Sequence, residues 1–203
     1  MLTTLDSIAT RRSIKQYDPA FQLPESDLQR LFEAAQQTPT AFNIQHWRIV
    51  RVTDPDQRRH LREAAWDQSQ VTDASELWVL CADLKAWEKS PKRYWRNADA
   101  NKQTVLVNMM DDFYRGKAQV ERDEAIRSCG MLAQTLMLAA TAMGYQSCPM
   151  IGFDMEGVSR LIRLPADHVI GLLLAIGRGT APAYPRGGTL PLDEVVLDNS
   201  FPL

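Results

Sequence analysis

The sequence contains few of the residues that build disulfide frameworks and metal centres. Its 203 residues include only three cysteines and three histidines. The cysteines are far apart and odd in number, so no disulfide framework or zinc motif is indicated, and we expect a reducing, cytoplasmic location. His46, His60 and His168 stand apart from any cysteine or carboxylate pair at ligand spacing, and we therefore expect no bound metal.

The sequence also lacks an excess of charge of either sign and a long hydrophobic run. Its 23 basic and 25 acidic residues nearly balance, which argues against a nucleic-acid-binding surface or a polybasic membrane anchor. The opening residues, MLTTLDSIATRRS, carry charges where a secretory signal needs an apolar core, and no stretch is suited to span a membrane. There is no internal repeat, and we expect a single domain over residues 1–203.

The most prominent feature that is present is one long apolar helix. We expect it to run from Asp123, as its N-cap, to Gly144, as the left-handed residue that ends it. Apolar side chains between Cys129 and Met143 leave almost no polar face, so the helix belongs in the centre of a core or across a subunit interface. Residues 145–153 read as a Pro/Gly turn that is suited to present backbone groups to a ligand.

The remaining elements follow from periodicity and capping residues. We expect helices at residues 5–10, 24–38, 55–66, 104–116 and 154–164, and strands at residues 48–53, 76–83 and 169–176. Their order indicates an α+β layered fold with a sheet that is not purely parallel. Residues 84–103 scatter Trp87, Tyr94 and Trp95 among charges, which indicates a lid or a flap with exposed aromatics. An extended, Pro/Gly-rich tail ends the chain.

Two polar motifs near the N-terminus are candidates for ligand binding. The segment RRSIK, residues 11–15, concentrates three cations and a hydroxyl, which suits a phosphate or a sugar hydroxyl; a solvated basic turn is the alternative. Further along, Asn43 and Gln45 would point the same way in an extended segment. Such amides either tie a loop together or bind a planar heterocycle.

Five segments together resemble the FMN-dependent nitroreductase family, and more narrowly the small bacterial NAD(P)H nitroreductases. They are RRSIKQYD, PTAFNIQHWRIV, WDQSQVTDAS, the central helix with MGYQSCPMIGFD, and LPLDEVV, and in this order they cover nearly the whole chain. The resemblance implies a nitroreductase-like fold with a mixed, largely antiparallel central sheet flanked by helices. It also implies a homodimer with the central helix at its interface and two FMN sites between the subunits.

The same resemblance implies which residues contact FMN. Arg11, Arg12 and Ser13 would hold the phosphate and ribityl chain, with Lys15 near the pyrimidine edge of the ring. Gln70 corresponds to another ring-edge contact, and Gln68 is the alternative. The other implied contacts are Thr40, Ala41 and Asn43, partly from the second subunit, Pro149, Met150, Ile151 and Gly152 along one ring face, and either Arg178 or Arg186 at the phosphate.

The activity that this resemblance implies is a ping-pong oxidoreduction. NAD(P)H would reduce FMN and then give way to a small electron acceptor such as a nitroaromatic compound or a quinone. A cation at Lys15 would favour the reduced ring, which carries negative charge at that edge. The alternatives are another flavin chemistry on the same fold, such as dehydrogenation or dehalogenation, and a non-enzymatic flavin-carrying protein whose flap binds a partner. We interpret Cys148 as a packing residue and His46 as structural.

Overall fold

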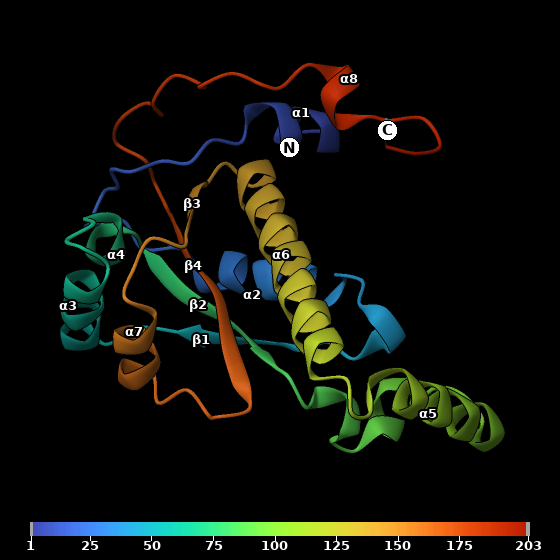
Figure 1. The fold of residues 1–203 in the computed structure, drawn as a ribbon. Coiled ribbons are helices and arrows are strands. Elements are labelled where there is room, and N and C mark those ends of the chain that lie inside the picture. Colours follow the sequence, from blue (N-terminus) through green and yellow to red (C-terminus); the bar gives the residue numbers. More distant parts are fainter. Residues whose placement is uncertain (1, 202–203) are drawn as a thin grey trace.

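A four-stranded sheet lies at the centre of the computed structural model, which describes residues 2–201 (Figure 1). Each neighbouring pair of strands is antiparallel. The strands, in the spatial order β1-β2-β4-β3, are β1 (Trp47–Arg51), β2 (Glu76–Asp83), β4 (His168–Gly177) and β3 (Gln146–Met150). The expected α+β fold is confirmed, and β1, β2 and β4 lie within two residues of their expected positions.

The central strand β2 is buried on both faces. Leu77 and Val79 contact one apolar cluster, whereas Trp78 and Leu80 contact another on the opposite side of the sheet. Alternate residues of a strand point to opposite faces, so a strand between two helical layers needs apolar residues at every position. This explains why the run ELWVLCAD shows no alternation with polar residues.

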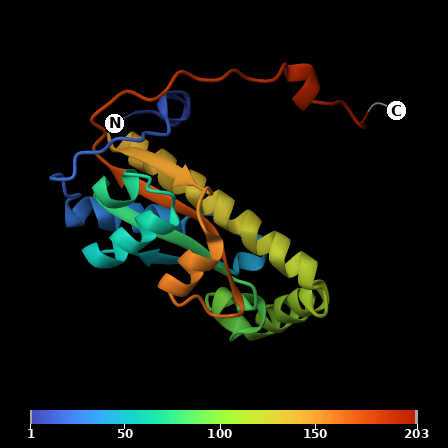
Figure 2. The same cartoon turned by 60° about the vertical axis from the view of Figure 1, so that its left-hand side comes forward.

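Helices cover both faces of this sheet (Figures 1 and 2). One face carries α3 (Pro55–Ala64), α4 (Gln70–Asp73) and α7 (Met155–Leu161), and the other carries α2 (Glu25–Gln36) and α6 (Ala118–Ala142). The remaining helices are α1 (Thr4–Thr10), which contacts α6, α5 (Ala100–Tyr114) beyond the end of the sheet, and α8 (Leu192–Val195) in the tail. No helix between residues 2 and 201 is long and apolar enough to cross a membrane.

Helix α6 begins earlier than the sequence indicates. Its first residue is Ala118, so the expected N-cap at Asp123 is wrong. The extra turn is held by Glu121, a buried carboxylate that accepts hydrogen bonds from Lys85 Nζ (2.6 Å) and Trp87 Nε1 (3.1 Å). The other end is as expected, because Gly144 follows the helix with a left-handed φ of 87°.

One stripe of α6 is exposed in the single chain. Leu132 and Leu136 are fully buried against the sheet, but Ile126, Gly130 and Gln134 face outwards at four-residue spacing. The helix is therefore not enclosed on every side by its own chain, which excludes the first of the two expected settings, the centre of a core, and leaves a subunit interface as the other.

The expected Pro/Gly turn after α6 is instead strand β3. Cys148 and Pro149 pair with Ala175 and Leu174 of β4. Proline is compatible with this position because β3 lies at an edge of the sheet, where a missing N–H costs least. Because proline and glycine are typical of turns, the sequence pattern does not predict this five-residue strand.

Residues 84–103, the flap, fold as two 3₁₀ turns and the start of α5. The turns are η2 (Ala86–Glu88) and η3 (Pro91–Trp95). The expectation of exposed aromatics is wrong for Trp87, which is only 3% exposed and stacks on Tyr114 with ring centroids 5.9 Å apart. The flap and α5 thus share a small apolar core.

Candidate functional site

The N-terminal segment lies along strand β3. The Ile14 N–H donates to the Ser147 carbonyl oxygen at 3.1 Å, and Ser13 forms a parallel bridge with Ser147. This pairing brings Arg11 and Lys15 beside the strand that leads into residues 149–152. Two of the segments that the sequence associates with FMN therefore meet at one end of the molecule.

The loop before α4 joins the same cluster. Gln68 Nε2 donates to the Gly152 carbonyl oxygen at 2.8 Å, and Ser69 Oγ donates to the Lys15 carbonyl oxygen at 3.4 Å. The two alternatives for a ring-edge contact differ in access. Gln70 is 3% exposed and its amide donates to Gln68 Oε1 and to Met150 Sδ, whereas Gln68 is only half-buried.

Trp66 also belongs to this cluster, although no sequence motif indicates it. Its side chain is 69% exposed and lies against Gly152, where an added Cβ atom would be 3.1 Å from Trp66 Cζ3. Trp66 and Asp67 both have left-handed φ angles, near 55° and 58°, which end α3 and turn the indole out of the helical pattern. Ile151, the neighbour of Gly152, is 76% exposed.

Three arginines gather at the phosphate end of the proposed site. Arg12 donates to the Tyr184 carbonyl oxygen, and Arg186 Nη2 donates to the carbonyl oxygens of Ala9 (2.9 Å) and Arg11 (3.3 Å). The tail therefore runs beside the RRS motif.

Of the two arginines left open by the sequence, Arg186 lies in this group. Arg178 lies elsewhere, stacked over Phe21 at 4.0 Å and 3.9 Å from an oxygen of Asp18.

The group fits a phosphate on a specific structural ground. Arg11 Nη1 is buried and has no hydrogen-bond partner among residues 2–201. A buried, unpaired guanidinium N–H is costly, and a phosphate oxygen is the partner that best satisfies it. Arg11 and Arg12 also line a cavity of about 250 Å³ between α1, α6 and β3. We conclude that the residues present are suited to hold the phosphate of a flavin mononucleotide.

The cysteine in this region is a packing residue in its structural setting. Cys148 is fully buried, and burial raises the pKa of its thiol, although the nearby positive charges of Lys15 and Arg11 oppose that rise. Burial also raises the pKa of Cys81 and of Cys129 to about 12. All three cysteines are free and buried, so none has the exposed thiolate of a redox site.

The flavin contacts expected from the segment PTAFNIQHWRIV lie in another part of the chain. Thr40 precedes the 3₁₀ turn η1 (Ala41–Asn43), which lies farther along α6, away from β3 (Figures 1 and 2). Asn43 Nδ2 donates to the Tyr94 carbonyl oxygen of the flap at 2.9 Å, and Thr40 Oγ1 accepts from the Gln45 N–H at 3.0 Å. A single chain does not bring these residues to Arg11 and Lys15.

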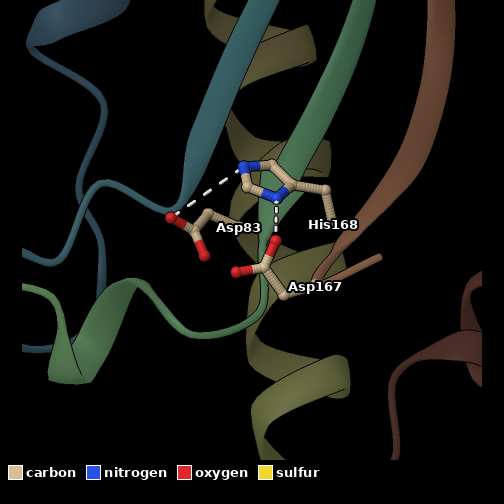
Figure 3. Close-up of side chains that lie close together, drawn as sticks. All are labelled: Asp83, Asp167 and His168. Atoms are coloured by element: carbon tan, nitrogen blue, oxygen red, sulfur yellow. Dashed lines mark hydrogen bonds and ion pairs between the residues drawn. The ribbon is translucent and has the colours of Figure 1, made fainter. Parts of the chain in front are cut away.

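A separate polar cluster corrects the expectation that His168 stands apart from carboxylates. Its Nδ1 lies 2.7 Å from Asp167 Oδ1, and its Nε2 lies 3.9 Å from Asp83 Oδ2 (Figure 3). Lys89 Nζ donates to both carboxylates, at 2.8 Å to Asp83 and 2.6 Å to Asp167. Lys89 and His168 lower the pKa of Asp167 to about 2. The Lys89 ammonium and the Arg48 guanidinium, 3.3 Å from Asp83, together balance the two carboxylates, and the Lys89 contacts tie the flap to the end of the sheet.

His46 is buried beside the same end of the sheet. Its Nδ1 lies 3.1 Å from Ser128 Oγ on α6, and burial lowers its pKa to about 4. A buried, neutral imidazole that contacts a helix is a structural group, in agreement with the interpretation from the sequence.

Comparisons with known proteins identify relatives over nearly the full chain. The sequence profile described as the nitroreductase family matches residues 8–178. Protein DrgA of Synechocystis sp. is 49% identical over 200 residues, which cover 96% of this chain and 95% of DrgA. A Thermus thermophilus protein named NADH dehydrogenase is 36% identical over 191 residues, which cover 92% of this chain and 91% of that protein.

A solved structure has the same fold. The crystal structure of the Bacillus subtilis protein ydfN superposes with a TM-score of 0.89 at 30% sequence identity, and the match covers 95% of this chain and 97% of that one. The layered fold is therefore shared over 95% of this chain.

Proposed function

The chain belongs to the nitroreductase family of oxidoreductases, and on that premise we propose that it is an FMN-dependent NAD(P)H oxidoreductase. The reaction is a ping-pong transfer in which NAD(P)H delivers electrons first and a nitroaromatic, quinone or similar acceptor receives them second. The observation that carries the proposal is the convergence of Arg11, Lys15 and Gln68 on the end of β3, with an unpaired guanidinium N–H at the phosphate position.

Different residues of this cluster bind the phosphate of FMN and contribute charge beside its ring. When bound, FMN supplies the hydride chemistry itself. Arg11, Arg12 and Arg186 bind its phosphate with Ser13 beside them, and Lys15 contributes positive charge at the pyrimidine edge. Gln68, rather than the buried Gln70, is the amide available to the ring edge, and residues 149–152 line one ring face.

A homodimer completes the site in this proposal. Thr40, Ala41 and Asn43 are too far along α6 to serve the cluster of their own chain, so they serve the site of a second copy. Two exposed apolar surfaces support the association. The apolar surface on α6 is small, Ile126 beside Gly130, which leaves room for a close approach, and the larger one is the tail, with exposed side chains at Leu190, Leu192, Val195, Val196 and Phe201.

The donor and the location follow from the same proposal. A relative named NADH dehydrogenase supports a nicotinamide nucleotide as the electron donor. Three free cysteines without a disulfide suit a reducing compartment, and we place the reaction in the cytoplasm.

The test is the flavin content and its response to the donor. Heat should release one FMN per chain from purified protein, identified by chromatography, and NAD(P)H should bleach the yellow protein in the absence of air. Yellow protein that neither nucleotide reduces would favour another flavin chemistry on the fold. Colourless protein that excess FMN cannot load would overturn the proposal.

A further inference from the structure

A second, larger cavity opens between β1 and the flap. The flap lies at the end of the molecule away from α1 and the start of β3 (Figure 1). The volume of the cavity is about 1040 Å³. One wall is formed by the end of α2, by η1 and by the start of β1, and the other by η3 and the first turn of α5. A space of this size accommodates a ligand larger than a simple electron acceptor.

The charge of the lining is strongly positive. Four cations line the cavity, Arg48, Arg93, Arg96 and Lys102, against one carboxylate, Asp99. Arg48 is paired with Asp83, which lies outside the lining, at 3.3 Å. For Arg96 and Lys102 no ion pair exists within residues 2–201, and Arg93 contacts only the Tyr94 side chain.

The single carboxylate offsets only part of this positive charge. Asp99 is the N-cap of α5, and its Oδ1 accepts the Lys102 backbone N–H at 2.9 Å. The carboxylate and the positive end of this 15-residue helix offset each other, so the positive excess at this wall comes from Arg93, Arg96 and Lys102. The cavity is arranged for an anion with more than one negative charge.

The lining also offers flat aromatic surface and an unsatisfied donor. Trp47, Tyr94 and Trp95 are all part of the wall. Trp95 Nε1 is buried and has no hydrogen-bond partner among the described residues. Buried indole N–H groups usually find an acceptor, so a ligand oxygen or ring nitrogen is missing at this position.

We propose that this cavity binds the phosphorylated adenosine half of NADPH. Arginine and lysine are the side chains that hold phosphates, and aromatic rings stack on purine bases. This inference rests on the proposed function, since it concerns the electron donor of the same reaction. Asn43 lines the cavity and is also the residue proposed to reach the partner's flavin, so a donor bound here would lie close to that flavin.

The excess of cations selects NADPH over NADH. The two donors differ by the 2′-phosphate, which adds roughly 1.5 to 2 negative charges near neutral pH. Arg93 and Arg96 are exposed on the flap, so they can approach that group without disturbing the core. The selectivity therefore resides in the flap rather than in the flavin site.

A binding titration with adenosine 2′,5′-bisphosphate tests the inference directly. The FMN-loaded protein is titrated by calorimetry alongside the double variant Arg93→Gln/Arg96→Gln. Charge-assisted hydrogen bonds to a phosphate correspond to about tenfold or more in affinity, so the double variant should bind the probe at least about tenfold more weakly. The KM for NADPH should rise by a similar factor, and the KM for NADH by less.

The double variant Arg30→Gln/Arg59→Gln is the matched control. It removes the same charge from α2 and α3, outside the cavity, and should bind the probe like the native protein. Equal affinity of the native and flap variants for the probe, or no binding to either, would overturn the inference. The titration does not depend on electron transfer, so it separates this outcome from a failure of the proposed function, which would show as a missing or unreactive flavin.

Discussion

The side-chain amide of Gln68 donates a hydrogen bond of 2.8 Å to the carbonyl oxygen of Gly152, across 84 residues of sequence. It links the loop after α3 to the segment that follows β3. Both partners lie beside the N-terminal cations, so one hydrogen bond holds two sides of the proposed flavin site in register.

Removing this hydrogen bond should weaken FMN binding. Gln68→Leu deletes a net contribution of about 0.5–1.5 kcal/mol, which predicts a dissociation constant roughly 2- to 12-fold higher in a fluorescence titration of the apoprotein. Gln57→Leu is the control, because Gln57 makes the equivalent amide-to-carbonyl bond to Leu161 at 3.0 Å on α3. Equal effects of the two variants would show that Gln68 acts through stability alone.

The unpaired N–H of Arg11 predicts a requirement for the phosphate of the cofactor. Arg11→Gln should raise the dissociation constant of FMN by about tenfold or more, because a charge-assisted hydrogen bond is lost. The affinity for riboflavin, which lacks the phosphate, should change little. Parallel titrations with the two flavins measure the difference, and a similar loss for both would contradict a phosphate contact.

The charge of Lys15 should set the reduction potential of the flavin. One to two kcal/mol of net stabilisation of the reduced, anionic ring corresponds to about 30 mV for a two-electron couple. Lys15→Met should lower the midpoint potential by about that amount in a dye-coupled reductive titration of FMN-loaded protein. An unchanged potential would mean that the ammonium acts on Cys148 and not on the ring.

The exposed stripe of α6 gives a test of the homodimer that does not disturb the core. Apart from the adjoining backbone of α6, no atom of residues 2–201 lies within 4 Å of a Cβ atom placed on Gly130, so Gly130→Gln is tolerated by the single chain and even favours the helix. If a second copy packs on this stripe, the long side chain should convert the dimer to a monomer in sedimentation velocity, whereas Gly130→Ala should not. Ala133→Arg is a poor test, since Ala133 is buried within its own chain.

His46 should make the protein less stable in mild acid. Its pKa is about 4 in the folded protein, mainly because of burial, against 6.5 for an ordinary histidine, so the unfolded chain binds the extra proton first. The contribution of neutral His46 to the free energy of unfolding is therefore fully present above pH 6.5, and up to roughly 3 kcal/mol of it is lost as the pH drops towards 4. Urea unfolding across this range should show the loss, and His46→Gln should remove most of the pH dependence.

Local patterns in the sequence were enough to predict most of the fold. Leu77, Trp78, Val79 and Leu80 specify a strand buried on both faces, and Gly144 specifies the end of α6. Strand β3 was missed because Pro149 opposes a strand in any local scheme. Its pairing with β4 and its position at the sheet edge decide the outcome, and both depend on residues far along the chain.

The proposed site was predictable only in part for the same reason. The RRS motif and the Gly152 region were recognisable. The choice between Gln68 and Gln70 depends on which side-chain amide is buried and hydrogen-bonded to Met150 Sδ, and the structure shows that it is Gln70. The contact of Lys89 with Asp167 crosses 78 residues and could not be foreseen, nor could the outward turn of Trp66. The position of Asn43 relative to the cations depends on a second copy of the chain.

The N-terminal segment protects the sheet as well as presenting its cations. Strand β3 is an edge strand, and the Ile14 N–H donates a hydrogen bond to the Ser147 carbonyl oxygen on its outer side. Nearby, Tyr17 forms a bridge with Gly179, and the Gln16 carbonyl oxygen accepts from the Thr180 N–H in the tail. A chain shortened by its first seventeen residues would leave this border open to pairing with other molecules. Truncation would therefore produce aggregates, and its effect on flavin binding could not be separated from the loss of soluble protein.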